Sequence, residues 1–166
     1  MILIVSILDL IIAVCLDTNH IKPITYNETA VSEKMEINLP SRLESVEQAA
    51  HKAAEFAKQS GFGEEFIDAI DMAVRESVAN AVKHGNKFDE TKPVEVTFSK
   101  LQDGFEITVR DFGPGFEVDE VPDPTNPENL LKASGRGVLF MRAFMDEVAW
   151  FNASGGGTLV KMTKKL

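Results

Sequence analysis

The sequence predicts a two-layer α/β sandwich, in which a mixed, mostly antiparallel sheet is covered by helices on one face. Residues 66–86 carry apolar side chains at three- and four-residue steps, which is typical of an amphipathic helix. Residues 94–98 and 105–111 alternate between apolar and polar side chains and flank Asp103-Gly104, a hairpin signal. The 166 residues are enough for one domain with a hydrophobic core.

The charge and the cysteine content exclude several kinds of site. The formal net charge is −9, whereas a general nucleic-acid surface needs an excess of Lys and Arg. Cys15 is the only cysteine, so an internal disulfide and a cysteine metal cluster are both excluded. A single cysteine fits a reducing compartment, and we expect a cytoplasmic protein.

The first residues differ from the rest of the chain in composition. Residues 1–16 are strongly apolar but short for a membrane span, and Asp9 lies in their middle. Polar residues follow up to residue 34. We expect residues 1–34 to lie outside a domain formed by residues 35–166. They would reflect either an upstream start codon or a segment that contacts a membrane.

The expected domain begins with a strand and a helix. Residues 36–39 alternate and predict a short strand that ends at Pro40. Ser41, with Glu44 three positions later, predicts a capping box for a helix that reaches about residue 59. The expected inner face of this helix consists of small and aliphatic residues: Leu43, Val46, Ala50, Ala53, Ala54 and Ala57.

The helix at residues 66–86 has two distinct faces. Its apolar stripe consists of Ile67, Ile70, Val74, Val78 and Ala81. A second face combines small residues with two polar ones: Ala69, Ala73, Glu76 and Asn80.

Small side chains on that second face let another segment approach the helix backbone. Glu76 and Asn80 are one turn apart, and together they could hold a proton and a hard cation. Taken alone, such a pair is more often part of a solvated surface. Gly85 follows the last turn, where a residue without a Cβ is expected to end the helix.

Asp111 stands at the end of the strand at residues 105–111. It shares its parity with Phe105, Ile107 and Val109, so its side chain points toward the apolar side of the sheet. Burying an unpaired carboxylate is costly. Two interpretations stay open: the strand has ended and Asp111 turns to water, or the carboxylate has a dedicated donor.

The C-terminal third contains a long loop and more glycine motifs. Residues 117–134 lack periodicity and predict a long mobile loop, which in compact domains often acts as a lid. Gly135-Arg136-Gly137 then leads into a helix at residues 138–145, where free backbone N–H groups favour an anion. Strands are expected at residues 147–151 and 158–162, with a glycine-rich turn between them.

The order of these motifs is more specific than any one of them. In sequence they are Glu76 and Asn80 on a helix, Asp111-x-Gly113-x-Gly115 after a strand, a long loop, Gly135-x-Gly137 at a helix start, and Gly157-Thr158. This set resembles the Bergerat-type ATP-binding superfamily of DNA gyrase B, histidine kinases and heat-shock chaperones. Within it, the tracts 75–85, 111–116 and 128–148 are similar to the small anti-sigma-factor serine/threonine kinases. The resemblance covers about residues 36–166.

The resemblance implies roles for the polar residues. Asn80 would bind Mg²⁺, and Glu76 would be the general base that takes a proton from the attacking hydroxyl. Asp111 would accept a hydrogen bond from the adenine amino group. Thr158 would support the adenine pocket beside Asp111.

The resemblance also implies roles for the glycine motifs. Gly113 and Gly115 would let the backbone approach the base and let the loop move. Gly135, Arg136 and Gly137 would present amides and a cation to the phosphates.

The activity implied by the resemblance is ATP-dependent phosphorylation of a serine or threonine on a small anti-sigma factor antagonist. The same molecule would sequester a sigma factor, and a homodimer is implied as well. Two alternatives stay open. One is an ATP- or ADP-responsive binding module without kinase activity, and the other is an ATPase that activates water with Glu76.

Overall fold

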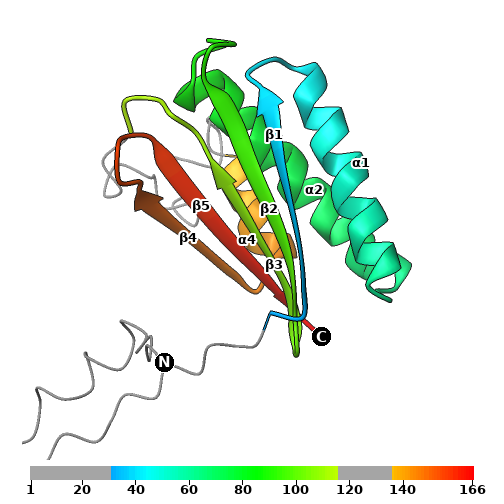
Figure 1. Ribbon diagram of the computed structural model, residues 1–166. Coiled ribbons are helices and arrows are strands. Elements are labelled where there is room, and N and C mark those ends of the chain that lie inside the picture. The colour runs from blue at the N-terminus through cyan, green and yellow to red at the C-terminus, as the bar shows by residue number, and fades with distance from the viewer. Residues whose placement is uncertain (1–30, 116–135) are drawn as a thin grey trace, which may run out of the picture.

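The computed structural model describes residues 31–115 and 136–166, without the side chain of Arg136. One sheet carries all five described strands, and Figure 1 shows α1, α2 and α4 packed against the same face of it. The expected two-layer α/β sandwich is therefore confirmed. The elements run β1 (Glu33–Pro40), α1 (Glu44–Gln59), α2 (Glu64–Asn80), η2 (Ala81–Gly85), β2 (Pro93–Leu101), β3 (Gly104–Arg110), α4 (Arg136–Phe144), β4 (Glu147–Asn152) and β5 (Thr158–Lys165).

The strand order is β1-β2-β3-β5-β4, and every neighbouring pair of described strands is antiparallel. The expectation of a mixed sheet was therefore wrong for the described strands. The last strand, β5, lies between β3 and β4. Because Arg110 pairs with Leu159, the end of β3 meets the start of β5. This pairing places Asp111 beside Thr158, although the two residues are far apart in sequence.

The start of α1 differs from the expected capping box. The helix begins at Glu44, and no side chain caps it. The Ser41 hydroxyl instead donates to the carbonyl oxygen of Lys92 at 2.6 Å, next to β2. Leu43, expected on the inner face, is 54% exposed. Val46 is partly buried and packs against the core, as expected. The buried residues of α1 are Ser45, Ala49, Ala50, Ala53, Phe56 and Ala57.

The predicted helix at residues 66–86 is confirmed as α2 followed by a π-helical turn, η2. Ile70, Val74 and Val78 are fully buried, as the apolar stripe predicts. The small-residue face of α2 packs against α4, and Ala69 and Ala73 on this face are buried. Ala69 and Ala143 of α4 also line a groove between the two helices.

The hairpin between β2 and β3 turns one residue earlier than Asp103-Gly104 suggested. Leu101 pairs with Gly104, so Gln102 and Asp103 form the turn and Gly104 belongs to β3. A Cβ at position 104 would collide with the carbonyl oxygen of Lys164 on β5. Gly104 is therefore explained by the close approach of β5 rather than by the turn.

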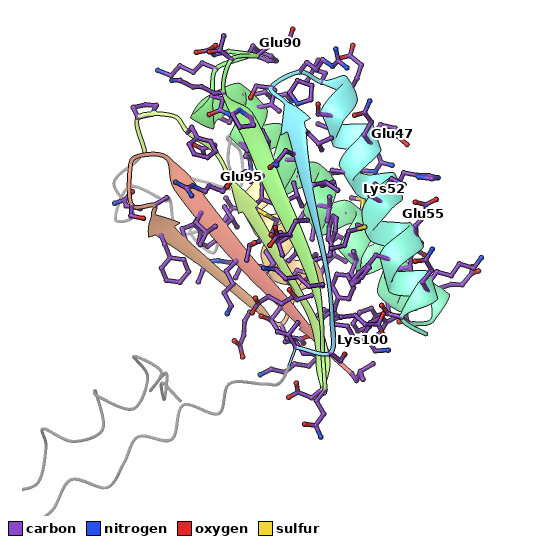
Figure 2. All side chains as sticks on the ribbon, in the orientation of Figure 1. Glu47, Lys52, Glu55, Glu90, Glu95 and Lys100 are labelled. Carbon is purple, nitrogen blue, oxygen red and sulfur yellow. The ribbon has the colours of Figure 1, made fainter. Side chains whose placement is uncertain are left out.

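Polar side chains cover the outer side of α1, where Figure 2 shows Glu47, Lys52 and Glu55 pointing away from the sheet. No helix in the described part of the chain is both long and apolar enough to cross a membrane. The apolar segment at residues 1–16 and the loop expected at 117–134 lie outside the described residues.

Candidate active site

A cavity of about 140 Å³ lies between the end of α2 and the adjoining ends of β3 and β5. Four predicted site residues line it: Asn80, Asp111, Gly115 and Thr158. The remaining lining residues are Ser77, Ala81, His84, Gly85, Val109, Trp150 and Val160. Whole-ligand pockets usually measure roughly 300–1,000 Å³, so this cavity matches one ring system rather than a complete nucleotide.

Asp111 is the buried carboxylate of the cavity, with 5% exposure. Its Oδ1 accepts hydrogen bonds from the backbone N–H groups of Gly113 at 2.9 Å and Thr158 at 3.2 Å. Its own backbone N–H donates to the carbonyl oxygen of Thr158 at 3.0 Å. Of the two interpretations of Asp111, the structure supports dedicated donors. These bonds fix the carboxylate's orientation at the cavity wall.

Two glycines make room for Asp111, and a third lets the segment after Asp111 pack against Gly85. A Cβ at Gly85 would collide with the Asp111 carboxyl group, and one at Gly157 would collide with the Asp111 carbonyl oxygen. A Cβ at Gly113 would collide with the carbonyl oxygen of Gly85. The helical segment ends at Gly85, as expected, because Gly85 is the last residue of the π-helical turn. The backbone of Gly85 does not have the positive φ that would require a glycine there. Close approach of the Asp111 carboxyl group explains this glycine instead.

Glu76 and Asn80 meet the first turn of α4. A Cβ built on Gly137 would lie 2.5 Å from Glu76 Oε2 and 3.5 Å from Asn80 Nδ2. The structure therefore brings these three predicted residues together, and a helix start near them favours a negative group. Gly135 and the side chain of Arg136 lie outside the described part of the chain.

Asp111, Asn80 and Glu76 follow one another in a row that starts in the cavity and continues along α2. Asp111 and Asn80 both line the cavity, and Glu76 lies one helical turn beyond Asn80 on α2. An elongated ligand with a ring at Asp111 could therefore extend past Asn80 toward Glu76 and Gly137. The described residues contain no group of three or more His, Cys, Asp or Glu side chains suited to a metal ion. A cation here would take further oxygens from its ligand or from water.

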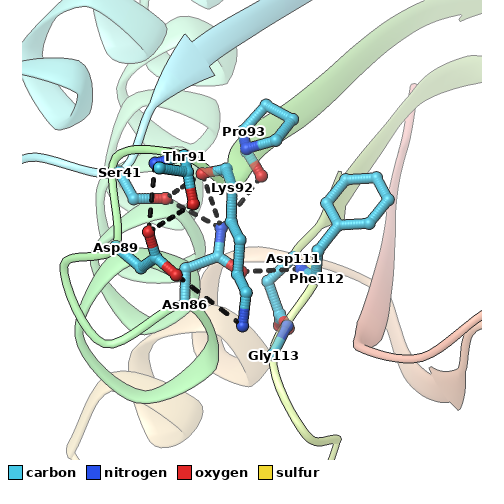
Figure 3. Close-up of polar contacts among 9 residues, drawn as sticks. All are labelled: Ser41, Asn86, Asp89, Thr91, Lys92, Pro93, Asp111, Phe112 and Gly113. Carbon is cyan, nitrogen blue, oxygen red and sulfur yellow. Dashed lines mark hydrogen bonds and ion pairs between the residues drawn. The ribbon is translucent and has the colours of Figure 1, made fainter.

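Asn86 is a buried residue next to the site that the sequence analysis missed (Figure 3). Its Nδ2 donates to Ser41 Oγ at 2.8 Å, to the carbonyl oxygen of Pro93 at 2.9 Å and to that of Lys92 at 3.2 Å. Its Oδ1 accepts from the backbone N–H of Phe112 at 2.7 Å. One side chain thus connects the end of η2 to β2, to the start of α1 and to the segment after β3.

The sequence contains a pattern that predicts side-chain hydrogen bonds for Asn86, but only to residues near it in the chain. Asparagine directly after a helix-ending glycine is typical of side-chain bonds to nearby backbone. The partners of Asn86 include Phe112, 26 positions away, and Ser41, 45 positions away. Only the packed structure identifies those contacts.

A larger groove of about 850 Å³ lies between the start of α2 and the end of α4. It is lined by residues such as Phe66, Met72 and Phe144 and by none of the predicted site residues. The predicted site residues that the structure describes therefore lie at the smaller cavity and beside it, not at this groove.

The chain is similar to known proteins over most of its length. A family model described as "Histidine kinase-like ATPase domain" matches residues 39–164. The chain is 33% identical over 140 residues to an "Anti-sigma F factor" of Clostridium perfringens (strain SM101), covering 82% of this chain and 99% of that protein. It is 28% identical over 136 residues to a "Serine-protein kinase RsbW" of Oceanobacillus iheyensis, covering 78% and 85% respectively.

A solved structure supports the fold independently. The chain resembles a structure of the RsbU and RsbW domains of a Mycobacterium tuberculosis protein with a TM-score of 0.60 and 20% identity. The similarity covers 81% of this chain and 33% of that one. At this identity the likeness concerns the fold alone.

Proposed function

The chain belongs to the histidine kinase-like ATPase domain family, and on this premise we propose that it is an ATP-dependent protein serine/threonine kinase that also acts as an anti-sigma factor. One structural observation supports the proposal: buried Asp111 and Asn80 line one cavity, and Glu76 lies next to Asn80 beside Gly137. This order suits an adenine ring at Asp111, a metal-bound phosphate at Asn80 and a phosphoryl acceptor at Glu76. The name of the relative at 28% identity supports the kinase activity, and the name of the relative at 33% identity supports the anti-sigma role.

The cavity at Asp111 would hold the adenine ring. The carboxylate is kept in place by two backbone N–H groups, so it can accept a hydrogen bond from the adenine amino group without reorganising. Thr158 supports this arrangement through its backbone contacts with Asp111. Gly113 and Gly115 would let the backbone approach the ring closely.

The phosphates would lie along the start of α4. The backbone N–H groups of Gly135, Arg136 and Gly137, together with the guanidinium of Arg136, would bind their oxygens. Mg²⁺ would be held by Asn80, whose amide oxygen suits a hard cation. When bound, Mg²⁺ would neutralise charge on the transferring phosphoryl group.

Glu76 would act as the general base. It would accept the proton of a serine or threonine hydroxyl while that oxygen bonds to the γ-phosphorus. The bond between the γ-phosphorus and the bridging oxygen would break, and ADP would leave. Glu76 favours an enzyme, because a pure ATP- or ADP-responsive binding module needs no base. An ATPase that activates water with Glu76 is the other alternative.

The partners form part of the proposal. The phosphoryl acceptor would be an anti-sigma factor antagonist, a small protein, and the sequestered partner a sigma factor. A homodimer and a cytoplasmic location are proposed with them. We also propose that residues 35–166 carry this function and that residues 1–34 lie outside the domain.

The test begins with the partners. A pull-down from the source organism, first with ATP and then with ADP, followed by mass spectrometry, would identify the antagonist and its phosphosite. The purified antagonist is then incubated with the protein and labelled ATP. Transfer to a serine or threonine is the expected result. Nucleotide binding without transfer would reject the kinase and support the binding module. Steady phosphate release without a protein acceptor would support the ATPase.

A further inference from the structure

Trp150, the only tryptophan of the chain, lies in the wall of the cavity. It is half-buried on β4 and pairs with Val160 of β5, which in turn pairs with Val109 of β3. All three side chains line the cavity. They form one continuous apolar wall across three neighbouring strands.

Arg142 of α4 contacts the indole ring of Trp150. Its guanidinium carbon lies 5.5 Å from the centroid of the Trp150 ring, within the range of a cation–π contact. A large aromatic side chain that is held between a helix and a sheet loses little freedom when a ligand packs against it. The wall is therefore preorganised for a contact with a flat ring.

The cavity combines this apolar wall with one polar anchor. Asp111 offers a buried acceptor whose orientation is fixed by backbone donors, while Trp150, Val160 and Val109 offer only apolar surface. An aromatic heterocycle needs both an apolar contact for its ring and a hydrogen-bond partner at its edge.

We propose that Trp150 contacts the base of the bound nucleotide and that this contact supplies part of the affinity for that base. The inference rests on the proposed function, since the ligand is taken to be a nucleotide. It adds a residue on β4, outside every motif that the sequence analysis identified.

Trp150 also packs against the hydrophobic core, so the test needs a readout that a purely structural role would not change. Its fluorescence provides one, because all tryptophan emission of the chain comes from this residue. Saturating ADP and saturating adenosine are each expected to change the emission. Inorganic tripolyphosphate, which lacks a base, is expected to leave it unchanged.

Affinity measurements on variants provide the second readout. Calorimetry with ATP is expected to show that Trp150→Ala binds roughly 5- to 100-fold more weakly, the usual worth of one base–aromatic contact. Trp150→Phe retains a ring and should lose less. Phe151→Ala is the matched control, because Phe151 is the next residue on β4, is 47% exposed and points to the other face of the sheet.

Thermal unfolding of each variant checks its fold, and Trp150→Leu replaces Trp150→Ala if the alanine variant does not fold. Two results would overturn this inference alone. One is nucleotide binding that leaves the tryptophan emission unchanged. The other is an ATP affinity of Trp150→Ala or Trp150→Leu equal to that of the unmodified chain. No binding of ATP or ADP by the unmodified chain would overturn both this inference and the proposed function.

Discussion

The side-chain oxygen of Asn86 accepts a hydrogen bond from the backbone N–H of Phe112 at 2.7 Å. This contact joins the end of the helix that carries Glu76 and Asn80 to the segment that carries Asp111 and Gly113 (Figure 3). One buried side chain therefore connects the two halves of the candidate site. Asn86 itself is not among the residues that line the cavity.

Replacing Asn86 should destabilise the protein and weaken nucleotide binding together. Asn86→Ala would leave the Phe112 N–H and the Lys92 and Pro93 carbonyl oxygens without this partner. Each buried polar group left unsatisfied costs about 1–3 kcal/mol. Urea unfolding should show a loss in that range or above it.

The matched control for Asn86 is Glu90→Ala, an exposed substitution in the same loop (Figure 2). Exposed surface substitutions usually change stability by about 0.5 kcal/mol or less. If Asn86→Ala and Glu90→Ala unfold at the same urea concentration, the network around Asn86 does not hold the site together.

The ion pair between α1 and α2 predicts a pH dependence of stability. Arg75 Nη1 lies 2.5 Å from Glu47 Oε2, and its Nε donates to Asp71 Oδ2 at 2.7 Å. The hydrogen bond from Arg75, and then its charge, lower the pKa of Glu47 below 4.5. A carboxyl group with a lowered folded-state pKa contributes stability above its unfolded pKa, and this contribution is lost as the pH falls through the folded pKa.

Glu47→Gln should therefore be less stable than the unmodified chain at neutral pH, and the difference should shrink below pH 4.5. Urea unfolding over a pH series measures it. Because Glu47 is exposed, the difference should be small and should decrease at high salt. If the stability difference between Glu47→Gln and the unmodified chain stays constant down to the lowest pH, the ion pair with Arg75 does not lower the pKa of Glu47.

The sequence predicts best those features that depend on neighbours along the chain. The apolar stripe of α2 follows from helical spacing, and Ile70 and Val74 are fully buried as expected. Strand parity places Asp111 on the apolar side of the sheet and leaves open whether the carboxylate turns to water, and the structure shows it buried. Periodicity is a local property, so tertiary packing does not need to be known.

The features that the sequence analysis missed depend on contacts between distant segments. Ser41 has the pattern of a helix cap, but its hydroxyl donates to Lys92, 51 positions away. Gly85 has the pattern of a helix end, and its missing side chain also makes room for Asp111, which directly follows β3. Trp150 reaches the cavity because β4, which carries it, pairs with β5, and β5 borders the cavity. Each of these contacts joins segments that are far apart in the sequence.

Asp111→Asn should weaken nucleotide binding while keeping the fold. The amide oxygen of asparagine can still accept from Gly113 and Thr158, but its NH₂ group cannot accept a hydrogen bond from an adenine amino group. Losing a bond to a charged group lowers affinity by roughly 10- to 100-fold. Calorimetry with ATP measures the loss.

The control for Asp111 is Asp103→Asn, which makes the same chemical change at an exposed hairpin turn. It should bind ATP like the unmodified chain. Equal ATP affinity in Asp111→Asn and Asp103→Asn would remove Asp111 from the proposed base-binding site.

Glu76→Gln should separate nucleotide binding from catalysis. The amide has nearly the same shape as the carboxylate beside Gly137 and Asn80, so ATP affinity should be retained. It cannot take up the proton of the attacking hydroxyl, and phosphoryl transfer should fall by roughly 10²–10⁴-fold, the usual contribution of a positioned base. Single-turnover transfer from labelled ATP to the antagonist measures the rate, with Glu65→Gln in the exposed first turn of α2 as the matched control. If Glu76→Gln transfers phosphate as fast as Glu65→Gln, the proton is taken by another group, and the row of polar residues only binds the nucleotide.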